Sequence, residues 1–274
     1  MADWAGDDGW RWRPLAPFGI EIDADLCSCL EGEAAGRFTD LYRGYGLIVA
    51  RNQRLDMEAQ TALLSHLGPI LRRAGESGYI STDNGGASLS ELRFHADGAY
   101  AARPLDALSL HAVEVVDGAS STRFVSAELA RQNLAADLRE SLSDLRVRMI
   151  SPAFEILGER SCDIVDPPFM QTSIKPLVYR HEGTGSACLW ASEMHAAAIE
   201  DMDREEGQAL LHRLFDSLYD ESNLLEHHWH RGDIIIWDNI RYQHARGPLT
   251  GVGRRVLQRV IVGTEGEAPH IGTA

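Results

Sequence analysis

Residues 234–246 read IIIWDNIRYQHAR, an apolar run that ends in Asp238 and Asn239 and is followed by His244. Such a run predicts a buried strand. It stands between two further strand patterns, NLLEHHWH at 223–230 and RRVLQRVIVG at 254–263. The C-terminal part of the chain is therefore predicted to consist of strands, and these strands determine the fold class that we expect.

Strand and helix patterns alternate over the rest of the chain. Alternating or apolar runs predict strands, and apolar residues at helical spacing predict helices. Strands are expected at 19–23, 47–51 and 105–116, and in a hairpin made by 176–181 and 187–192. Helices are expected at 31–46, 57–70, 126–145 and 203–220, of which 126–145 is the longest.

Three stretches carry no regular pattern. Residues 1–16 are rich in Trp, Asp, Gly and Pro and predict a flexible N-terminal segment. Residues 75–90 predict a loop, and residues 146–176 are irregular. Because no repeat or linker divides the chain, we expect a single domain over 1–274, a β-rich sandwich or barrel decorated with helices.

The composition narrows the classes of function. With 44% hydrophobic and 24% charged residues, the chain can form a substantial core. Its net charge of −15 argues against binding to nucleic acid or to an anionic membrane surface, because both require positive charge. A small anionic ligand remains compatible with this charge if arginines gather in a pocket.

Cysteine usage and hydropathy indicate a cytoplasmic protein. The four cysteines, Cys27, Cys29, Cys162 and Cys188, are scattered and lack the paired spacing of a structural zinc site. The N-terminal residues show no secretory leader pattern. No apolar run approaches the roughly 20 residues that span a bilayer.

The stretch FHADGAY at 94–100 holds a candidate pair of metal ligands. If it is a strand, His95 and Asp97 project from the same face. Two ligands make a weak site, and His244 after the apolar strand is the best candidate for a third. Two histidines and one carboxylate are the usual ligand set of non-haem Fe(II) oxygenases.

Other interpretations of these histidines remain open. A single His in a chain with 11 histidines is more often exposed or satisfied by hydrogen bonds. His228 and His230 share a strand face in EHHWHRGD, with His227 on the other face, and form an alternative zinc pair. We interpret three further histidines, His111, His181 and His212, as structural or exposed.

The strand after His244 places arginines beside this candidate site. Arg255, Leu257 and Arg259 share a strand face, and guanidinium groups bind carboxylates bidentately. A sheet face that opens onto a metal and carries two arginines suits a carboxylate ligand. Arg246 and Arg254, in contrast, are interpreted as surface residues that pair with the acidic surface.

Most of the chain resembles the TauD/TfdA (taurine dioxygenase-like) family of Fe(II)- and 2-oxoglutarate-dependent dioxygenases. The resemblance runs in order through PFGIEIDADL, YRGYGLIVARNQRLDMEAQTALLSHLGPI, FHADGAY, STRFVSA, PLVYRHEGTGSACLW, HRGDIIIWDNIRYQHARG and RRVLQRVIVG. The combination of HxD with WDN-x(4)-H is specific, whereas neither element is specific alone. The resemblance implies a mainly β fold with α insertions, whose core is a double-stranded β-helix (a cupin-like jelly roll) flanked by helices.

The same resemblance implies roles for individual residues. His95, Asp97 and His244 correspond to the Fe(II) ligands, and Thr122 and Arg255 to the residues that hold 2-oxoglutarate. The residues on the substrate side are Arg259, as an anchor for an anionic group, and Tyr100. The segment Trp237-Asp238-Asn239 corresponds to scaffold that orients a ligand without touching the metal.

The resemblance also implies the reaction, though not the substrate. Such an enzyme uses Fe(II), 2-oxoglutarate and O2, and oxidises a C–H bond of a small anionic substrate while 2-oxoglutarate becomes succinate and CO2. The carboxylate of Asp97 argues for hydroxylation, because halogenating relatives replace it; Ala96 departs from the more common HTD motif. The alternatives are a zinc-dependent hydrolase and a non-catalytic 2-oxoglutarate-binding jelly roll. Relatives commonly form homodimers or tetramers.

Overall fold

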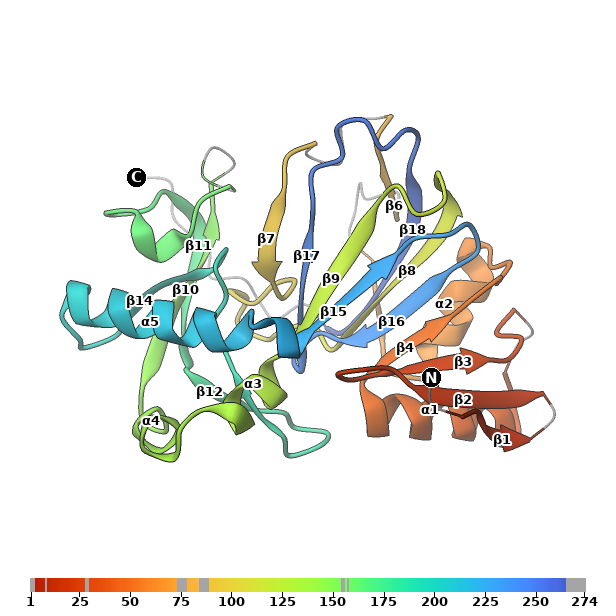
Figure 1. The fold of residues 1–274 in the computed structure, drawn as a ribbon, viewed down its shortest axis with the longest axis horizontal. Coiled ribbons are helices and arrows are strands. Elements are labelled where there is room, and N and C mark those ends of the chain that lie inside the picture. Colours follow the sequence, from red (N-terminus) through yellow and green to blue (C-terminus); the bar gives the residue numbers. More distant parts are fainter. Residues whose placement is uncertain are drawn as a thin grey trace.

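The computed structural model describes residues 3–7, 9–27, 30–72, 78–83, 89–153, 156 and 158–264. Two sheets face each other at its centre (Figure 1). Within the described residues the larger sheet has the order β1-β2-β3-β4-β16-β8-β18-β5, and β6 pairs with β18. These strands are β1 (Ala5–Asp7), β2 (Trp10–Pro14), β3 (Ile20–Asp23), β4 (Leu47–Ala50), β5 (Ile70–Leu71), β6 (Tyr79–Ser81), β8 (Ala107–Glu114), β16 (Ile234–Asp238) and β18 (Val256–Val262).

The smaller facing sheet has the order β15-β9-β17-β7. Its strands are β7 (Leu92–His95), β9 (Ser121–Ser126), β15 (Leu224–His228) and β17 (Tyr242–Arg246). The inner faces of the two sheets enclose an apolar core in which Ile235 and Trp237 of β16 and Leu257 of β18 meet Phe124 of β9. This is the sandwich that the alternating strands predicted, and its pairing is antiparallel except between β3 and β4.

Two helices cover the outer face of the larger sheet. They are α1 (Gly32–Tyr45) and α2 (Met57–Ser65), and Phe38 and Leu64 pack on Ile234 and Ile236 of β16. Successive side chains of a strand point to opposite faces, so the residues 234–237 of β16 are all apolar because both faces of the strand are buried. Gly46 ends α1 with a φ of +70°, a left-handed conformation that glycine adopts readily.

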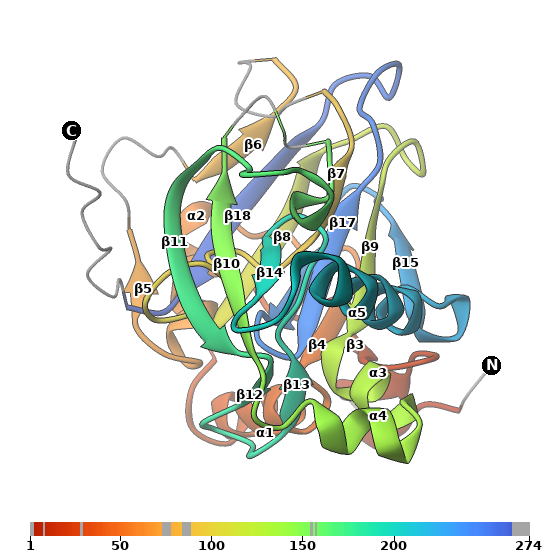
Figure 2. The same cartoon turned by 90° about the vertical axis from the view of Figure 1, so that its left-hand side faces the viewer.

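A second layer lies beyond the smaller sheet (Figure 2). It contains the three-stranded sheet β11-β10-β14, the hairpin β12–β13 and the remaining helices. These elements are β10 (Arg146–Pro152), β11 (Phe169–Pro176), β12 (Val178–Arg180), β13 (Ala187–Leu189), β14 (Ala196–Ile199), α3 (Ala127–Asn133), α4 (Ala136–Ser141), α5 (Arg204–Leu218) and the 3-10 turns η2 (Ser161–Asp163) and η3 (Glu221–Asn223). They share one apolar core, to which Phe215 of α5 and Met149 of β10 belong.

The predicted long helix over 126–145 is wrong. The chain forms the two short helices α3 and α4, which are separated where Leu134 and Ala135 adopt extended backbone angles, with ψ of 145° and 143°. The side chain of Leu134 is buried in the apolar core beneath α5. Burial of Leu134 thus accompanies a break that local helix propensity does not reveal. The longest of the described helices is α5, whose N-terminus is capped by the Asp203 carboxylate.

Residues 146–176 were expected to be irregular, and this expectation is also wrong. They include β10 and β11, which pair antiparallel over most of their length. In β10 the buried Val147 and Met149 alternate with the exposed Arg146 and Arg148. The period of two residues is present in the sequence, but the run is short and interrupted by charged residues.

The N-terminal segment belongs to the sheet, where we expected a flexible segment. β1 pairs with β2, and β2 pairs with β3, so the described part of this segment forms strands. The predicted loop at 75–90 contains the short strand β6, while its residues 75–77 and 84–88 lie outside the described residues. None of the described helices is both long and apolar enough to cross a membrane.

Candidate metal centre

Three side chains with metal-ligating atoms converge at the smaller sheet. In the antiparallel pair β7–β17, His95 lies opposite His244, and the centroids of their rings are 4.2 Å apart. Oδ1 of Asp97 lies 3.3 Å from Nε2 of His95 and 3.8 Å from Nε2 of His244. One ligand atom from each residue lies within 4.8 Å of the other two.

Asp97 reaches this position by a turn and not by strand alternation. We expected His95 and Asp97 to share one face of a strand, but β7 ends at His95. The following turn has a hydrogen bond from the backbone N–H of Ala99 to the carbonyl of Ala96, and Gly98 has a φ of +66°. The turn directs the carboxylate toward the two histidines, so the predicted neighbourhood is present for a different reason.

The hydrogen bond of His95 leaves its other nitrogen available for a metal. Nδ1 of His95 lies 2.8 Å from the carbonyl oxygen of Arg93, which can only accept, so Nδ1 carries the hydrogen of the neutral ring. Nε2 then presents a lone pair to the carboxylate of Asp97. Two acceptors that face each other at 3.3 Å are stabilised by a cation between them.

Asn239 fixes the backbone on both sides of the Asp97 residue. Its Oδ1 accepts a hydrogen bond from the Asp97 N–H, at 2.9 Å, and its Nδ2 donates to the carbonyl oxygens of Asp97 and Leu105. Asn239 is fully buried. The WDN segment therefore positions the carboxylate through the main chain, without a side-chain contact to it.

Burial and charge set the protonation states of two ligands. Burial, and next the repulsion from His95 when that ring is protonated, lower the pKa of His244 to about 3, so the His244 imidazole is neutral near pH 7. Burial alone would raise the pKa of the Asp97 carboxyl, but its neighbours, His95 first and Arg259 among them, hold it well below its usual range. A neutral imidazole and an ionised carboxylate are the forms that bind metals.

Arg259 lies on the side of the site formed by β18. Its Nη1 is 3.8 Å from Oδ2 of Asp97. It also lines a cavity of about 810 Å³ bounded by α2, β5 and β18, to which Met57 and Ile70 contribute. Arg259 therefore contacts the metal-binding carboxylate and contributes to the wall of a space large enough for a small molecule, whereas none of the three metal ligands lines that space.

Arg255 is a buried cation with an unused donor. It is 3% exposed, and its Nε has no hydrogen-bond partner among the described residues. Burial and the charge of the neighbouring Arg246 lower the pKa of Arg255 to about 10. Two guanidinium groups close together in the interior repel each other, and a carboxylate bound between them relieves the repulsion.

The buried position of Arg246 corrects the surface interpretation of that residue. Arg246 is 7% exposed and follows His244 at the same-face spacing of β17, which is the sequence signal that we missed. Arg254 does lie at the surface, where it forms ion pairs with Asp83 and Glu114.

Thr122 of β9 is buried, and its hydroxyl can still donate a hydrogen bond. Its Oγ1 accepts a hydrogen bond from the indole N–H of Trp229, at 3.0 Å. A threonine hydroxyl has one hydrogen of its own besides its lone pairs. Thr122 is thus held in place with a donor for a ligand oxygen.

Tyr100 and His195 border the ligand cluster from the second layer. Tyr100 follows the turn that carries Asp97, and its ring centroid is 5.4 Å from that of His195. His195 lies immediately before β14, with its ring centroid 6.0 Å from that of His95. Burial and the charge of His95 lower the pKa of His195 to about 3.

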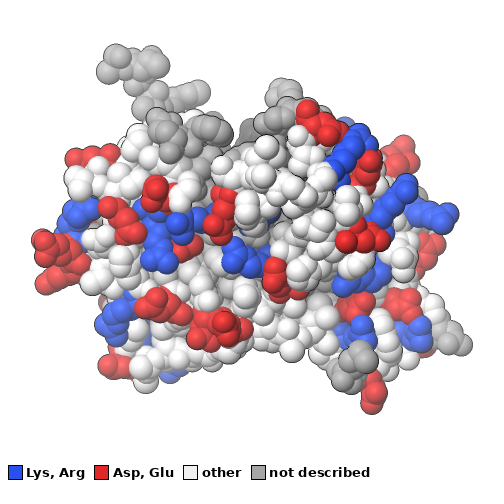
Figure 3. Space-filling view, turned by 45° about the horizontal axis from the view of Figure 1, so that its top comes forward, with Lys and Arg blue, Asp and Glu red and all other residues white. Residues whose placement is uncertain are grey.

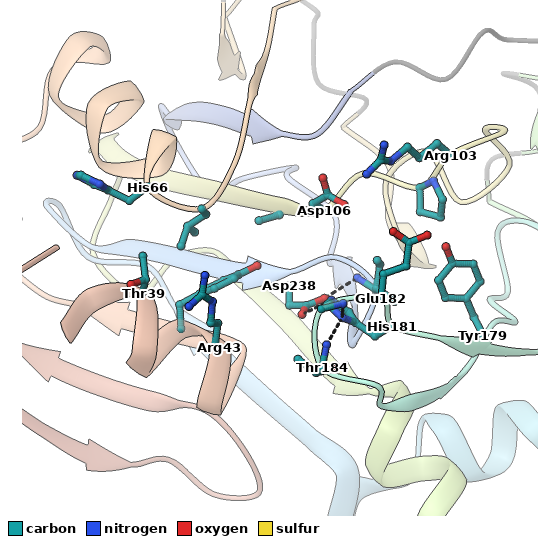
Figure 4. Close-up of a pocket in the computed structure, with 16 residues that line it drawn as sticks. Thr39, Arg43, His66, Arg103, Asp106, Tyr179, His181, Glu182, Thr184 and Asp238 are labelled. Atoms are coloured by element: carbon teal, nitrogen blue, oxygen red, sulfur yellow. Dashed lines mark hydrogen bonds and ion pairs between the residues drawn. The ribbon is translucent and has the colours of Figure 1, made fainter. Parts of the chain in front are cut away.

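A further cavity of about 420 Å³ is lined by Asp238 of the WDN segment (Figure 4). α1 supplies Thr39 and Arg43 on one side, and the β12–β13 hairpin supplies His181 and Glu182 on the other. His181 contacts Asp238 at 3.0 Å. None of the predicted metal or 2-oxoglutarate residues lines this cavity, so we assign His181 a structural role in holding the hairpin to the turn.

His228 and His230, the alternative zinc pair, do not form a potential metal site among the described residues. His228 and His230 are both exposed, and His227 is buried against Asp233 at 3.0 Å. These histidines belong to none of the potential metal clusters found among the described residues. His111 is buried and contacts the carbonyl oxygen of Gln53, which agrees with a structural role.

A second potential metal cluster joins Cys162, Asp163 and His212. Nε2 of His212 lies 2.6 Å from Oδ1 of Asp163, and the Gln208 side chain donates to the same oxygen at 2.9 Å. Burial and the charge of Asp163 raise the pKa of the Cys162 thiol to about 12, which disfavours the thiolate that binds metals. This cluster is a hydrogen-bonded contact between η2 and α5.

Lys and Arg side chains form no continuous patch on the face shown in Figure 3, where blue and red groups are interspersed. Nucleic-acid-binding surfaces carry an excess of basic groups. The face in Figure 3 carries charges of both signs and no such excess.

Residues 11–261 match the model of the TauD/TfdA family, described as the taurine catabolism dioxygenase family. The chain belongs to this family. The 2,4-dichlorophenoxyacetate dioxygenase of Cupriavidus pinatubonensis is 24% identical over 278 residues, which cover 90% of this chain and 94% of that protein. The family recognised from the sequence motifs is therefore confirmed.

Solved structures show the same fold. A taurine dioxygenase from Burkholderia xenovorans has a TM-score of 0.78 at 22% identity and covers 93% of this chain and 90% of its own. The enzyme AAD-2, solved with Mn(II) and N-oxalylglycine, has a TM-score of 0.75 at 20% identity and covers 93% and 98%. The jelly-roll core with flanking helices is thus confirmed.

Membership in this family gives the reaction class. Its members are dioxygenases that use Fe(II), 2-oxoglutarate and O2, so the protein is an oxidoreductase of this type. The unused donor of Arg255, the free hydroxyl hydrogen of Thr122 and the facing acceptors of His95 and Asp97 fit a divalent metal and a dicarboxylate. Neither the zinc hydrolase nor the non-catalytic jelly roll finds support in these relatives.

Proposed function

We propose that the enzyme hydroxylates a C–H bond of a small anionic substrate at the site formed by His95, Asp97 and His244. The observation that carries this proposal is the convergence of three ligand atoms within 4.8 Å beside a buried arginine with an unused donor. Two histidines and a carboxylate on one face leave the other metal positions open for small ligands.

The protein residues have distinct tasks in this reaction. His95, His244 and Asp97 would hold Fe(II), while Arg255 and Thr122 would hold and orient 2-oxoglutarate by its carboxylate. Iron bound there supplies the oxidation of the substrate C–H by O2, coupled to conversion of 2-oxoglutarate to succinate and CO2. Arg255 and Arg246 neutralise the cosubstrate, and the surrounding apolar core keeps bulk water away.

The anionic character of the substrate is supported by Arg259. Its guanidinium lies 3.8 Å from the Asp97 carboxylate, and Arg259 is one of the residues that line the cavity of about 810 Å³. The names of two similar enzymes refer to a phenoxyacetate and to taurine, which are a carboxylate and a sulfonate. We assign Tyr100 to the substrate side as well, because its ring lies 5.4 Å from that of His195, which in turn lies 6.0 Å from the ring of His95.

Metal and cosubstrate binding can be tested without knowing the substrate. Anaerobic addition of Fe(II) and 2-oxoglutarate should produce the weak visible band that their complex gives. The band should disappear in Asp97→Ala and His244→Ala and persist in the matched control Asp163→Ala. A band that persists in both ligand variants would refute the site.

The wider setting is also part of the proposal. We place the enzyme in the cytoplasm as a homodimer or homotetramer, with the chain acting as one catalytic domain. The free cysteines, of which Cys162 and Cys188 are buried, agree with a reducing compartment. Sedimentation of the purified protein measures the oligomeric state.

A further inference from the structure

His195 is a buried histidine whose ring is fixed by one residue of β10. Its Nδ1 lies 2.9 Å from the carbonyl oxygen of Ile150, and its own carbonyl oxygen accepts a hydrogen bond from the Ile150 N–H at 2.8 Å. Main chain and side chain of His195 are therefore both bonded to Ile150. This double contact fixes the orientation of the imidazole relative to β10.

The same contact determines which ring nitrogen carries the hydrogen. A carbonyl oxygen only accepts, so Nδ1 of His195 is the donor, and Nε2 of the neutral ring is an acceptor. His195 is 4% exposed, and its Nε2 has no hydrogen-bond partner among the described residues. An unpaired buried acceptor is costly, and such groups are rare unless a ligand or water completes them.

The unpaired nitrogen belongs to the neighbourhood of the reacting centre. The ring of His195 lies 6.0 Å from that of His95 and 5.4 Å from that of Tyr100, measured between centroids. Imidazole nitrogens point in diverging directions, so Nε2 is turned away from the β10 carbonyl. His195 is not a fourth ligand, because the cluster of mutually close ligand atoms contains only His95, Asp97 and His244 at this site.

We propose that His195 binds the substrate, with Nε2 accepting a hydrogen bond from an N–H or O–H group, so that the preferred substrate is an anion that also carries such a donor. This inference rests on the proposed function, because it takes the metal centre as the place of reaction. Arg259 would hold the anionic end, and His195 would recognise the donor. An analogue without the donor leaves Nε2 unpaired, which favours the donor-bearing molecule on the order of ten- to a hundredfold.

The test uses pairs of carboxylates that differ only at the donor: N-phenylglycine with phenoxyacetate, and indole-3-acetate with benzofuran-3-acetate. Their dissociation constants are measured anaerobically on the Fe(II)- and 2-oxoglutarate-loaded enzyme from changes in its visible band. At least one N–H member should bind about tenfold or more tightly than its oxygen partner. If no pair shows such a preference, the proposal is wrong.

Two polar variants separate recognition from structure. His195→Asn keeps a donor near the Nδ1 position but has no acceptor at the Nε2 position, whereas His195→Gln keeps an acceptor there. The preference should disappear in His195→Asn and be retained at least in part in His195→Gln. A preference that is equal in the wild type and in His195→Asn would overturn the proposal.

A spectroscopic readout is independent of the iron chemistry. In the zinc- and 2-oxoglutarate-loaded protein, the ¹⁵N resonance of His195 Nε2, assigned with His195→Gln, should lie in the unprotonated range. It should shift on addition of the N–H ligand but not of its oxygen partner, and equal shifts would contradict the proposal. Loss of the iron and 2-oxoglutarate band itself would instead refute the proposed function, so the two failures are distinguishable.

Discussion

Two clusters of potential metal ligands among the described residues differ in how their polar atoms face each other. At the triad, Nε2 of His95 presents a lone pair to the carboxylate of Asp97 at 3.3 Å. At the second cluster, His212 and Gln208 both bond to one oxygen of Asp163, at 2.6 and 2.9 Å. With a neutral His95 the first arrangement places an acceptor opposite an acceptor, which a bound cation stabilises. The second pairs donors with an acceptor and is satisfied without a cation.

The difference teaches that residue types alone do not define a metal site. Both clusters contain a histidine and a carboxylate, and the second adds a cysteine. What distinguishes them is the surrounding hydrogen bonds: the Arg93 carbonyl holds the hydrogen of His95 on Nδ1, and Asn239 fixes the main chain at Asp97. The following experiments test this contrast.

The largest difference is expected between the two histidines. His95→Ala should lower the affinity for Co(II) or Mn(II), used as redox-stable probes, by more than about a hundredfold, because a direct ligand is lost. The matched variant His212→Ala should leave metal affinity unchanged. Isothermal titration of both variants measures the effect, and an equal loss would remove the distinction between the clusters.

Asn239 tests whether the main-chain support matters. Asn239→Ala removes three hydrogen bonds at Asp97 and Leu105 and should weaken metal binding about ten- to a hundredfold. The control is Asn223→Ala, which removes a buried amide that bonds to Ser126 and Leu218 away from the site. Both variants should lose stability in urea, but only Asn239→Ala should lose metal affinity.

Asp163 should matter for folding and not for the metal. Asp163→Ala removes the bonds from Gln208 and His212 that join η2 to α5. Since the group is partly exposed, we expect a loss of about 1 kcal/mol in the free energy of unfolding. Urea titration measures this value. A fall in metal affinity at the triad would show that the second cluster is coupled to it.

The smallest expected effect is a pH dependence at the second cluster. Burial would raise the pKa of Asp163, but hydrogen bonds from Gln208 and His212 lower it below 3.8. Its contribution to stability is therefore present above about pH 4 and lost as the pH falls through the folded-state pKa. The stability difference between wild type and Asp163→Asn should shrink between pH 5 and pH 3, and a constant difference would contradict this sign.

The sequence predicted the neighbourhood of the site better than its geometry. The spacing of His95, Asp97 and His244 suggested a common site, and the structure brings their side chains together. The reason given for Asp97 was wrong, because a turn and not a strand directs it. Arg246 was not identified from the sequence as a buried cation. Arg246 shares a strand face with His244, but this spacing alone does not show which residues become buried.

The secondary structure predicted from local sequence patterns was also wrong for parts of the second layer. Residues 126–145 have helical composition, yet burial of Leu134 accompanies a break, and the short alternation in 146–152 forms the central strand β10. These elements depend on contacts with distant segments, which a window of neighbouring residues does not contain.

The sequence by itself determined the family, the apolar strand of β16 and the identity of the residues that could bind a metal, because these depend on residue type and spacing. Only the tertiary structure decided which of them face each other as acceptors, that Asn239 supports Asp97, and that His195 has an unpaired nitrogen beside the site. The hydrogen on the His195 ring is placed by the carbonyl oxygen of Ile150, which is 45 residues away in the sequence. The direction of a lone pair is thus a property of the fold.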